Sequence, residues 1–297
     1  MNRETIAMVG FGDLGERLAA RLPTTKWRAI GLRRRAHCVP VGVRGVPIDL
    51  RDPATLCCLG DIQPQALVVT LTPQERSAEG YSAGFSGAMG SIIAGLAGHQ
   101  PRRAIFVSST RVYAESDGAW VEEDAQLNRD DSFAGAIIDA EERFLEALPG
   151  GVILRAAGLY GDGPGRFLRR VAAGKRSAAD PLRYTNRIHR DDLAAFMAHL
   201  LVQPHSERVY NLVDDAPAPV QEVERWLCEQ LQLPYEHSLE PSSDQIDASP
   251  VVHKRVRNSR LHASGFELAY PTYREGYGAV LRRWMAHSER EDGLDLH

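Results

Sequence analysis

Short, unbroken runs of apolar residues recur along the first half of the chain, with longer amphipathic stretches between them. Strands are expected where these runs fall, at residues 6–9, 27–32, 43–48, 66–71, 104–107 and 152–154. Unbroken runs of this kind are typical of strands buried on both faces, as in a parallel sheet. A later run predicts one more strand at residues 210–213.

The stretches between these strands predict helices. Leu14, Leu18 and Leu22 recur every four residues until Pro23 interrupts the pattern, which is typical of a helix with one apolar side. Further helices are expected at residues 81–98, 132–148, 192–202, 220–231 and 273–286. Strands that alternate with helices predict βαβ units and a parallel sheet covered on both faces.

The pattern changes after Gly161. The string GDGPG at 161–165 is incompatible with regular structure, residues 234–250 predict a polar surface loop, and the charged last ten residues predict a frayed end. We therefore expect an α/β fold with a Rossmann-type doubly wound parallel sheet in residues 1–160. A smaller C-terminal α/β substrate domain is expected in residues 161–297, with its strands and helices partly interleaved with the first domain.

Composition and charge narrow the possible partners. The 297 residues carry 35 Lys and Arg against 39 Asp and Glu, a formal net charge of −4, which argues against nucleic-acid binding driven by bulk charge. No run approaches the ~18 apolar residues of a membrane span, and residues 6–9 are too short for the apolar core of a signal peptide. The four cysteines form no C-x-x-C pair, so we expect no metal site, no disulfide framework and a cytoplasmic location.

A glycine-rich turn follows the first predicted strand. The string GFGDLG at 10–15 has the form G-x-G-x-x-G and opens the first predicted helix. Glycines allow the tight turn and the close approach of a pyrophosphate, whose charge the helix start favours. The alternative is a structural glycine turn. The residues expected to contact a dinucleotide here are Gly10, Gly12, Asp13, Leu14 and Gly15.

The end of the second predicted strand carries Arg33 and Arg34, followed by Arg35. An NAD enzyme usually places an acid here to hold the ribose 2′-hydroxyl, whereas arginine accommodates a 2′-phosphate with its fork of donors. The alternative is a solvated basic turn. The arginines therefore favour NADP over NAD as the cofactor.

Several further strings occur in order: SSTRVY at 108–113, LR at 154–155, GLYG at 158–161, NRIHRDDL at 186–193 and YNLV at 210–213. Together with the glycine turn, this series resembles the extended short-chain dehydrogenase/reductases, the superfamily of nucleotide-sugar epimerases and dehydratases. The resemblance covers residues 5 to about 215. It implies a bound nicotinamide dinucleotide, a small substrate domain in the C-terminal third, and a homodimer formed by the helices at 81–98 and 133–148.

The chain departs from this family at two places. Its glycine turn is one residue shorter than the usual G-x-x-G-x-x-G, and Phe133 and Ile137 stand where the family's catalytic Tyr and Lys belong, followed by Glu141 in the place of the usual glutamate. Phenylalanine has no proton to give, and isoleucine has no charge that lowers a phenol pKa. General acid–base catalysis is commonly worth ~10²–10⁴ in rate, so the usual catalytic machinery is absent. Members described as atypical resemble this pattern.

The segment that follows the strand at 104–107 contains three candidates for a rearranged catalytic site. Ser109 matches the family's substrate-orienting Ser or Thr; alternatively it caps a backbone group. Arg111 stands beside Thr110 where the sugar dehydratases carry an acidic pair, so it either receives an anionic substrate or forms a surface ion pair. Tyr113 supplies a displaced phenol or serves packing, and the same alternatives hold for Tyr160.

Other candidates follow from the resemblance or from strand ends. Asp49 and Leu50 match an Asp-Leu pair beside the adenine; alternatively Asp49 caps the helix that begins at Pro53. Leu71 and Thr72 close the strand at 66–71 and are expected to contact the cofactor.

The predicted substrate domain contains a possible acid–base cluster and two arginines. His189 with Asp191 and Asp192 either forms a base–acid cluster or is structural, with an aspartate as helix cap and His189 bracing the two domains. Arg183 and Arg187 are candidates for binding a substrate phosphate or carboxylate; alternatively they lie on a solvated face.

Two functions remain open from the sequence. The first is an NADP-dependent oxidoreductase or epimerase-like enzyme with a rearranged acid–base site and an unidentified small substrate, for which an anionic or nucleotide-linked molecule is one candidate. The second is a non-catalytic NADP-binding sensor or regulatory protein. An α/β-hydrolase is disfavoured, because the sequence contains no G-x-S-x-G.

Overall fold

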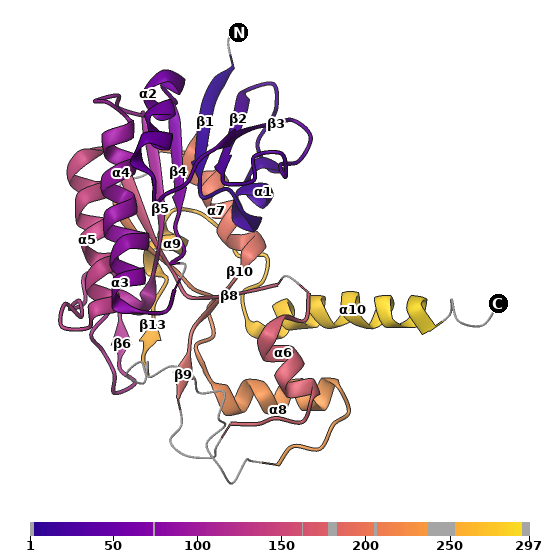
Figure 1. Cartoon of the computed structure of the whole chain (residues 1–297). Helices are drawn as coiled ribbons and strands as arrows, with labels where there is room; N and C mark the ends of the chain where they lie inside the picture. Colours follow the sequence, from indigo (N-terminus) through magenta and orange to yellow (C-terminus); the bar gives the residue numbers. More distant parts are fainter. Residues whose placement is uncertain are drawn as a thin grey trace.

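The computed structural model describes residues 3–73, 75–161, 163–177, 183–204, 207–236 and 253–292. Its centre is a seven-stranded sheet with the order β11-β7-β5-β4-β1-β2-β3, in which every neighbouring pair is parallel (Figure 1). The strands are β1 (Glu4–Val9), β2 (Trp27–Arg33), β3 (Val43–Pro47), β4 (Ala66–Thr70), β5 (Arg103–Ser109), β7 (Gly151–Ala156) and β11 (Val209–Leu212). The predicted doubly wound Rossmann-type sheet is confirmed.

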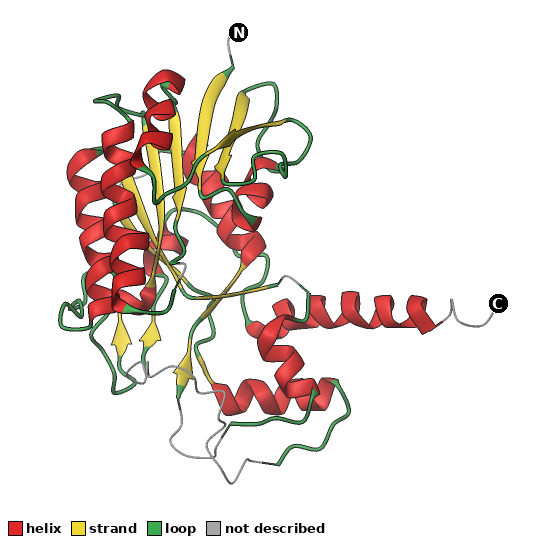
Figure 2. Cartoon of the chain, in the orientation of Figure 1, coloured by secondary structure: helices red, strands yellow, loops and turns green. Residues whose placement is uncertain are grey.

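Helices cover both faces of the sheet (Figure 2). Along β1, Ile6 and Met8 pack into the core on one face and Ala7 and Val9 into the core on the other, which explains the unbroken apolar run. The first face is covered by α1 (Asp13–Ala19), α7 (Arg190–Val202) and α9 (Ser259–Ala263). The second is covered by η1 (Pro53–Cys57), α2 (Cys58–Ile62), α3 (Ala78–Tyr81), η2 (Ser82–Gly87), α4 (Ala88–Gly95) and α5 (Ser132–Ala147).

The predicted helix at 81–98 is divided into three parts. It begins at Ala78, passes through a π-helical turn over η2, and its last part, α4, ends at Gly95. A side chain at Gly95 would come within 2.4 Å of the Leu56 carbonyl oxygen, and one at Gly84 within 2.9 Å of Pro73. These two glycines therefore serve close packing inside the chain, so they no longer support the predicted homodimer, which stays a prediction.

The segment after residue 160 contributes to both halves of the molecule. β11 lies beside β7 at the edge of the central sheet, and α7 packs against α1. The smaller unit has its own core around Leu168, Leu227 and Tyr277. Its elements are α6 (Gly165–Ala172), β9 (Tyr184–Thr185), β12 (Ala218–Pro219), α8 (Val220–Gln230) and α10 (Tyr273–Asp292).

Two short strand pairs complete the fold. β8 (Gly158–Tyr160) pairs with β10 (Arg187–His189), and β6 (Trp120–Val121) pairs with β13 (Arg255–Val256). The first pair runs between the central sheet and the smaller unit (Figure 1). α10 continues six residues past the predicted end at 286 into the expected frayed tail. Of the loop predicted at 234–250, only 234–236 are described, and residues 293–297 and Asp162 also lie outside the described residues.

The described residues form neither a membrane-spanning helix nor a metal-binding cluster. They contain no helix that is both long and apolar enough to cross a membrane. Within the same residues, no three His, Cys, Asp or Glu side chains come together in a way that could hold a metal ion.

Candidate functional site

The glycine turn is shaped by the ring of Phe11. Gly10 has a φ of +77°, and a Cβ there would lie 1.9 Å from the Thr70 carbonyl oxygen of β4. A Cβ at Gly15 would lie 2.7 Å from the Phe11 ring, and one at Gly31 2.8 Å from the same ring. Phe11 is buried between the first turn of α1 and β2. The turn is therefore one residue shorter than the family pattern and still closely packed.

The start of α1 has no side-chain cap, because its N-cap residue is Gly12. Asp13 follows, and its carboxylate is paired with Arg17 at 2.8 Å and with Arg190 at 2.7 Å. The uncapped turn opens into a cavity of about 410 Å³ at the carboxyl ends of β1, β4, β5 and β7. Open α/β sheets bind ligands at this edge, where a helix start favours an anion.

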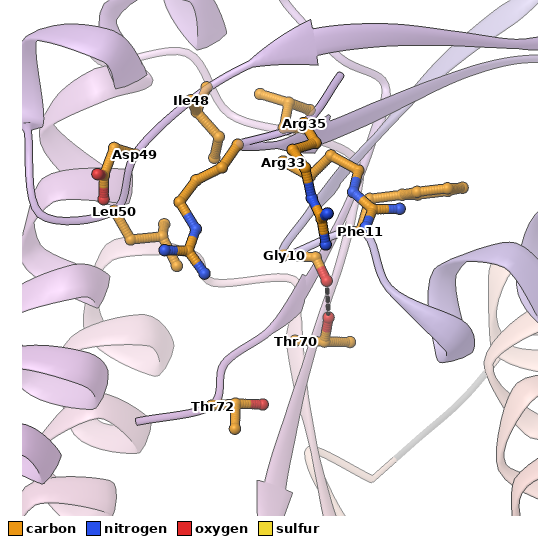
Figure 3. A pocket seen from close by; sticks show the side chains of 11 residues that line it. Gly10, Phe11, Arg33, Arg35, Ile48, Asp49, Leu50, Thr70 and Thr72 are labelled. Atoms are coloured by element: carbon orange, nitrogen blue, oxygen red, sulfur yellow. Dashed lines mark hydrogen bonds between the residues drawn. The ribbon is translucent and has the colours of Figure 1, made fainter. Parts of the chain in front are cut away.

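A second cavity of about 230 Å³ adjoins the first, since both are lined by Gly10, Thr70 and Thr72. Figure 3 shows Arg33 and Arg35 across this second cavity from Asp49 and Leu50. Together the cavities form one groove along the edge of the sheet. The predicted cofactor residues that line it are Gly10, Gly12, Asp13, Leu14, Arg33, Arg34, Asp49, Leu50, Leu71 and Thr72. Gly15 does not line it and instead makes room for the ring of Phe11.

The arginines of the second cavity differ in their contacts. Arg33 donates to the Cys38 carbonyl oxygen at 2.8 Å and lies 3.5 Å from Glu16. Arg34 and Arg35 are exposed at the rim and form no ion pair within the described residues. Among the residues lining this cavity, the three arginines face one carboxylate, Asp49, so the groove carries net positive charge at this end.

The carboxylate of Asp49 is already paired within its own loop. Arg51 lies 2.8 Å from it, and that hydrogen bond lowers the pKa of Asp49 to about 2. The cap of the turn at Pro53 is Asp52, which accepts from the Ala54 amide at 3.1 Å. The alternative that Asp49 caps this turn is therefore wrong, because its carboxylate is held by Arg51.

The positions of the family's catalytic Tyr and Lys are occupied by Phe133, which belongs to an aromatic cluster, and by Ile137. Phe133 on α5 meets the Tyr81 ring edge-on at 4.6 Å between centroids. The Arg111 guanidinium lies 4.8 Å from the Phe133 centroid and 3.6 Å from Asp131. Ile137 is 1% exposed in the core. No phenol and no ammonium group therefore stands at these two positions, and Arg111 packs over the ring that replaces the tyrosine.

Ser109 ends β5 and lines the larger cavity. Its Oγ accepts from the Arg111 amide at 3.2 Å, which leaves its own hydrogen without an acceptor among the described residues. Ser108, its neighbour, instead donates to the buried Glu141. Both alternatives predicted for Ser109 are therefore compatible with the structure, since the hydroxyl caps a backbone group and still has a donor for the cavity.

Tyr113 belongs to a buried hydrogen-bond network. Its hydroxyl donates to Asn211 Oδ1 at 2.6 Å and accepts from Arg155, which also holds Glu141 at 2.7 Å. Burial raises the pKa of Tyr113 to about 12. The residue lines neither cavity of the groove. Tyr113 is thus a structural residue, because burial and both hydrogen bonds oppose any use of the phenol as a catalytic acid or base.

Tyr160 is also buried away from the groove. Its ring packs 4.7 Å from that of Tyr277 and 5.2 Å from that of His189, and its hydroxyl lies 3.5 Å from the Thr272 carbonyl oxygen. Burial raises its pKa. It is not among the residues that line the two cavities, so packing explains it better than catalysis.

The His189 cluster is structural. His189 Nδ1 accepts from the Asp191 amide at 3.2 Å, so the cap of α7 is the histidine and the expected aspartate cap is wrong. Asp191 pairs with Arg17 at 2.9 Å. Asp192 accepts from the backbone amides of Ala269 and Tyr270. Burial lowers the pKa of His189 to about 4, which makes the imidazole neutral at physiological pH.

The two predicted substrate arginines do not line the groove. Arg187 is buried, donates to Thr185 Oγ1 at 2.6 Å and lies against the rings of Phe167 and Tyr273. It serves the core of the smaller unit, and the alternative of a solvated face is also wrong. Arg183 is half-buried just before β9, where its carbonyl accepts from the Val220 amide.

Several lining residues of the larger cavity were not predicted. They are Thr70, Phe85, Val107, Ser108, Ala156, Ala157, Leu159 and Arg190. The apolar members carry no chemical signal in the sequence. Arg190 does carry one, since it is a charged residue at the start of a predicted helix, next to the His-Asp-Asp string.

Comparisons with known proteins identify relatives in sequence and in fold. No family model matches the chain. Protein YeeZ of Escherichia coli K12 is 33% identical over 222 residues, which are 72% of this chain and 78% of YeeZ. A structure from Methylobacillus flagellatus, provisionally described as an NAD-dependent epimerase/dehydratase, is 34% identical with a TM-score of 0.78 over 95% of this chain and 99% of that one. The enzyme WbmG of Bordetella bronchiseptica in complex with NAD shares the fold at 15% identity, with a TM-score of 0.77 over 96% and 95%.

Proposed function

Since the chain belongs to the extended short-chain dehydrogenase/reductases, the family of the NAD-dependent epimerases and dehydratases, we propose that it binds a nicotinamide dinucleotide and acts on a small substrate beside it. The observation that carries this proposal is the continuous groove at the sheet edge. The groove combines a turn that leaves no room for side chains at Gly10, an uncapped helix start and a cationic end. These features fit the backbone, the pyrophosphate and the adenosine end of a dinucleotide.

We propose NADP as the preferred dinucleotide. Arg33, Arg34 and Arg35 follow one another at the end of β2, where an acid would otherwise hold the ribose 2′-hydroxyl. Arg34 and Arg35 form no ion pair in the described part of the chain, although the charge of Arg34 helps to lower the pKa of Asp49, so their donors are available to a phosphate. Each charge-assisted contact is worth roughly 1.5–3 kcal/mol, so NADPH should bind about tenfold or more tightly than NADH.

Titration calorimetry with NADPH and NADH tests both statements. The triple variant with Arg33, Arg34 and Arg35 each replaced by Ala should lose the preference for NADPH and keep most of its affinity for NADH. Arg44→Ala is the matched control, because Arg44 is an exposed arginine on the neighbouring strand β3 that does not line the groove. Equal affinities of the unmodified protein for the two cofactors would refute NADP preference, and absence of binding would refute the proposed function.

The bound nicotinamide would supply a hydride donor or acceptor, and the chain would position the substrate against it. The Ser109 hydroxyl has a free hydrogen that can be donated to a substrate carbonyl or hydroxyl oxygen at the larger cavity. Arg111, two residues further along, lies over the ring of Phe133 and 3.6 Å from Asp131, and it lines neither cavity. The serine would thus polarise a substrate oxygen without a phenol.

An enzyme of this kind should turn over slowly on ordinary sugar nucleotides or simple alcohols. Phe133 and Ile137 provide no proton transfer, and Tyr113 is held in the core. Turnover is measured from the absorbance of reduced nicotinamide with a panel of keto acids, keto sugars and nucleotide sugars. Ser109→Ala should abolish whatever turnover the best substrate gives, while the NADPH affinity stays unchanged.

The second candidate is a non-catalytic NADP-binding sensor, favoured by the hydrophobic residues at both dyad positions. A sensor binds the cofactor, shows no turnover with any of these substrates and is unaffected by Ser109→Ala. The predicted homodimer is a separate proposal for either function. A monomeric mass by light scattering at micromolar concentration would contradict it.

A further inference from the structure

Arg190 lies where two helix starts and the groove meet. It is the first residue of α7, directly after β10, and its side chain lines the larger cavity together with Gly12, Asp13 and Leu14. Figure 1 shows α7 beside α1. Ser109 lines the same cavity. One cavity therefore brings together Arg190, the glycine turn and the serine proposed to contact the substrate.

The guanidinium of Arg190 is oriented but only partly used. Its Nη1 donates to Asp13 Oδ2 at 2.7 Å, which fixes the plane of the group. Its Nε is buried without an acceptor, and its Nη2 makes no hydrogen bond to any described residue. The side chain is 27% exposed and lines a cavity, so Nη2 and the second hydrogen of Nη1 remain as donors for a ligand.

The charges around Arg190 leave an excess positive charge at this point. Arg17, Arg21 and Arg190 surround the carboxylates of Asp13 and Asp191, with pair distances of 2.7–2.9 Å. Three guanidinium groups against two carboxylates give a net charge of +1. Asp13 would otherwise repel an anion at the glycine turn, and this network neutralises it.

We propose that Arg190 binds the pyrophosphate of the dinucleotide, as a second anchor beside the glycine turn. This inference rests on the proposed function. Arg190 lines the larger cavity, with Gly12 and the start of α1, and does not line the second cavity, which contains Arg33–35. Its ligand is therefore the linking pyrophosphate and not the 2′-phosphate. Planar guanidinium groups match phosphate oxygens with two donors at once. The second half of the chain thereby contributes a residue to a cofactor site that the first half otherwise forms.

The test compares four ligands by titration calorimetry. NADPH, NADH and ADP-ribose contain the pyrophosphate, and adenosine 2′-monophosphate does not. Arg190→Gln should weaken the first three about ten- to a hundredfold and change the fourth less than about twofold. Arg21→Gln is the matched control, because Arg21 belongs to the same ion-pair network at 2.9 Å from Asp191 but does not line the cavity. It should leave all four affinities within about twofold.

Other outcomes separate the two proposals. If Arg190→Gln binds NADH and ADP-ribose as the unmodified protein does, the inference is wrong and the proposed function stands. If Arg21→Gln weakens them as much as Arg190→Gln, Arg190 only links the helices, which also overturns the inference. If the unmodified protein binds no dinucleotide, both proposals fail. Arg190→Lys keeps the charge and loses the fork, so it should bind with intermediate affinity, and this variant decides the question should Arg190→Gln fail to fold.

Discussion

The buried carboxylate of Asp214 lies beside the connection between the two units, and the free-energy cost of its ionisation can be measured directly. Asp214 follows β11 and is 1% exposed, and its amide donates to the Arg187 carbonyl oxygen of β10 at 2.6 Å. One carboxylate oxygen accepts from the Ala216 amide at 3.3 Å, and the other has no partner. Burial, opposed by the charge of Arg187, raises the pKa of Asp214 from its ordinary 3.8 to about 7. The replacement Asp214→Asn keeps the shape and the acceptor and removes the ionisation.

The sign of the effect follows from proton linkage. An acid whose pKa is raised by folding destabilises the fold wherever it ionises more readily in the unfolded chain. The penalty is absent below pH 3.8, grows as the pH rises, and is complete above about pH 7. Each tenfold difference in proton affinity is about 1.36 kcal/mol, so the full penalty is about 4 kcal/mol of unfolding free energy. Part of it already acts at pH 5.

Urea denaturation of both proteins at pH 5 and pH 8.5 measures this penalty. The stability advantage of Asp214→Asn over the unmodified protein should widen by about 2–3 kcal/mol between these pH values. Other titrating groups cancel in the difference, and Asp61→Asn, at an exposed aspartate of α2, is the control whose stability difference should stay constant. An advantage that is the same at both pH values, or that shrinks as the pH rises, would refute the reasoning.

Three further variants test the site. Gly15→Ala places a methyl group 2.7 Å from the Phe11 ring, so we expect a loss of about 1–3 kcal/mol of stability and weaker cofactor binding; an unchanged melting temperature would contradict the packing. Tyr113→Phe leaves a buried acceptor unpaired, so we expect a cost of about 1–3 kcal/mol in denaturation, with unchanged NADPH affinity and turnover; a specific loss of turnover would restore the phenol as a catalytic group. Phe133→Tyr with Ile137→Lys buries a lysine in an apolar site, so the melting temperature should fall without cofactor and partly recover with NADPH; robust turnover by the unmodified protein would refute the absence of acid–base machinery.

The sheet was predictable because two-sided burial is visible in the sequence. Met8 and Val9 face opposite cores, and both must be apolar. The glycine turn was predictable for a similar reason, since Gly10 adopts a conformation that other residues rarely take. Signals of this kind depend on residues that are neighbours in the chain, so they can be recognised in the sequence without knowledge of the three-dimensional contacts.

The roles of single polar residues were not predictable in the same way. Tyr113 has the chemistry of a catalytic acid, and only its hydrogen bond to Asn211, 98 residues away, assigns it to the core. Arg187 has the chemistry of an anion receptor and is buried instead. Arg190 meets Asp13 across 177 residues of sequence. Contacts over such separations are set by the tertiary fold, so residue type and spacing do not determine them.

The return of β11 and α7 to the central sheet bears on how the protein can be dissected. A fragment that stops at residue 160 would lack the helix whose Leu193, Phe196 and Met197 cover one face of the sheet, and it would leave the backbone of β7 unpaired along one edge. Exposed apolar faces and open strand edges promote aggregation. Expression of residues 1–160 alone should therefore yield insoluble material, and a soluble truncation has to retain the chain through β11 at Leu212.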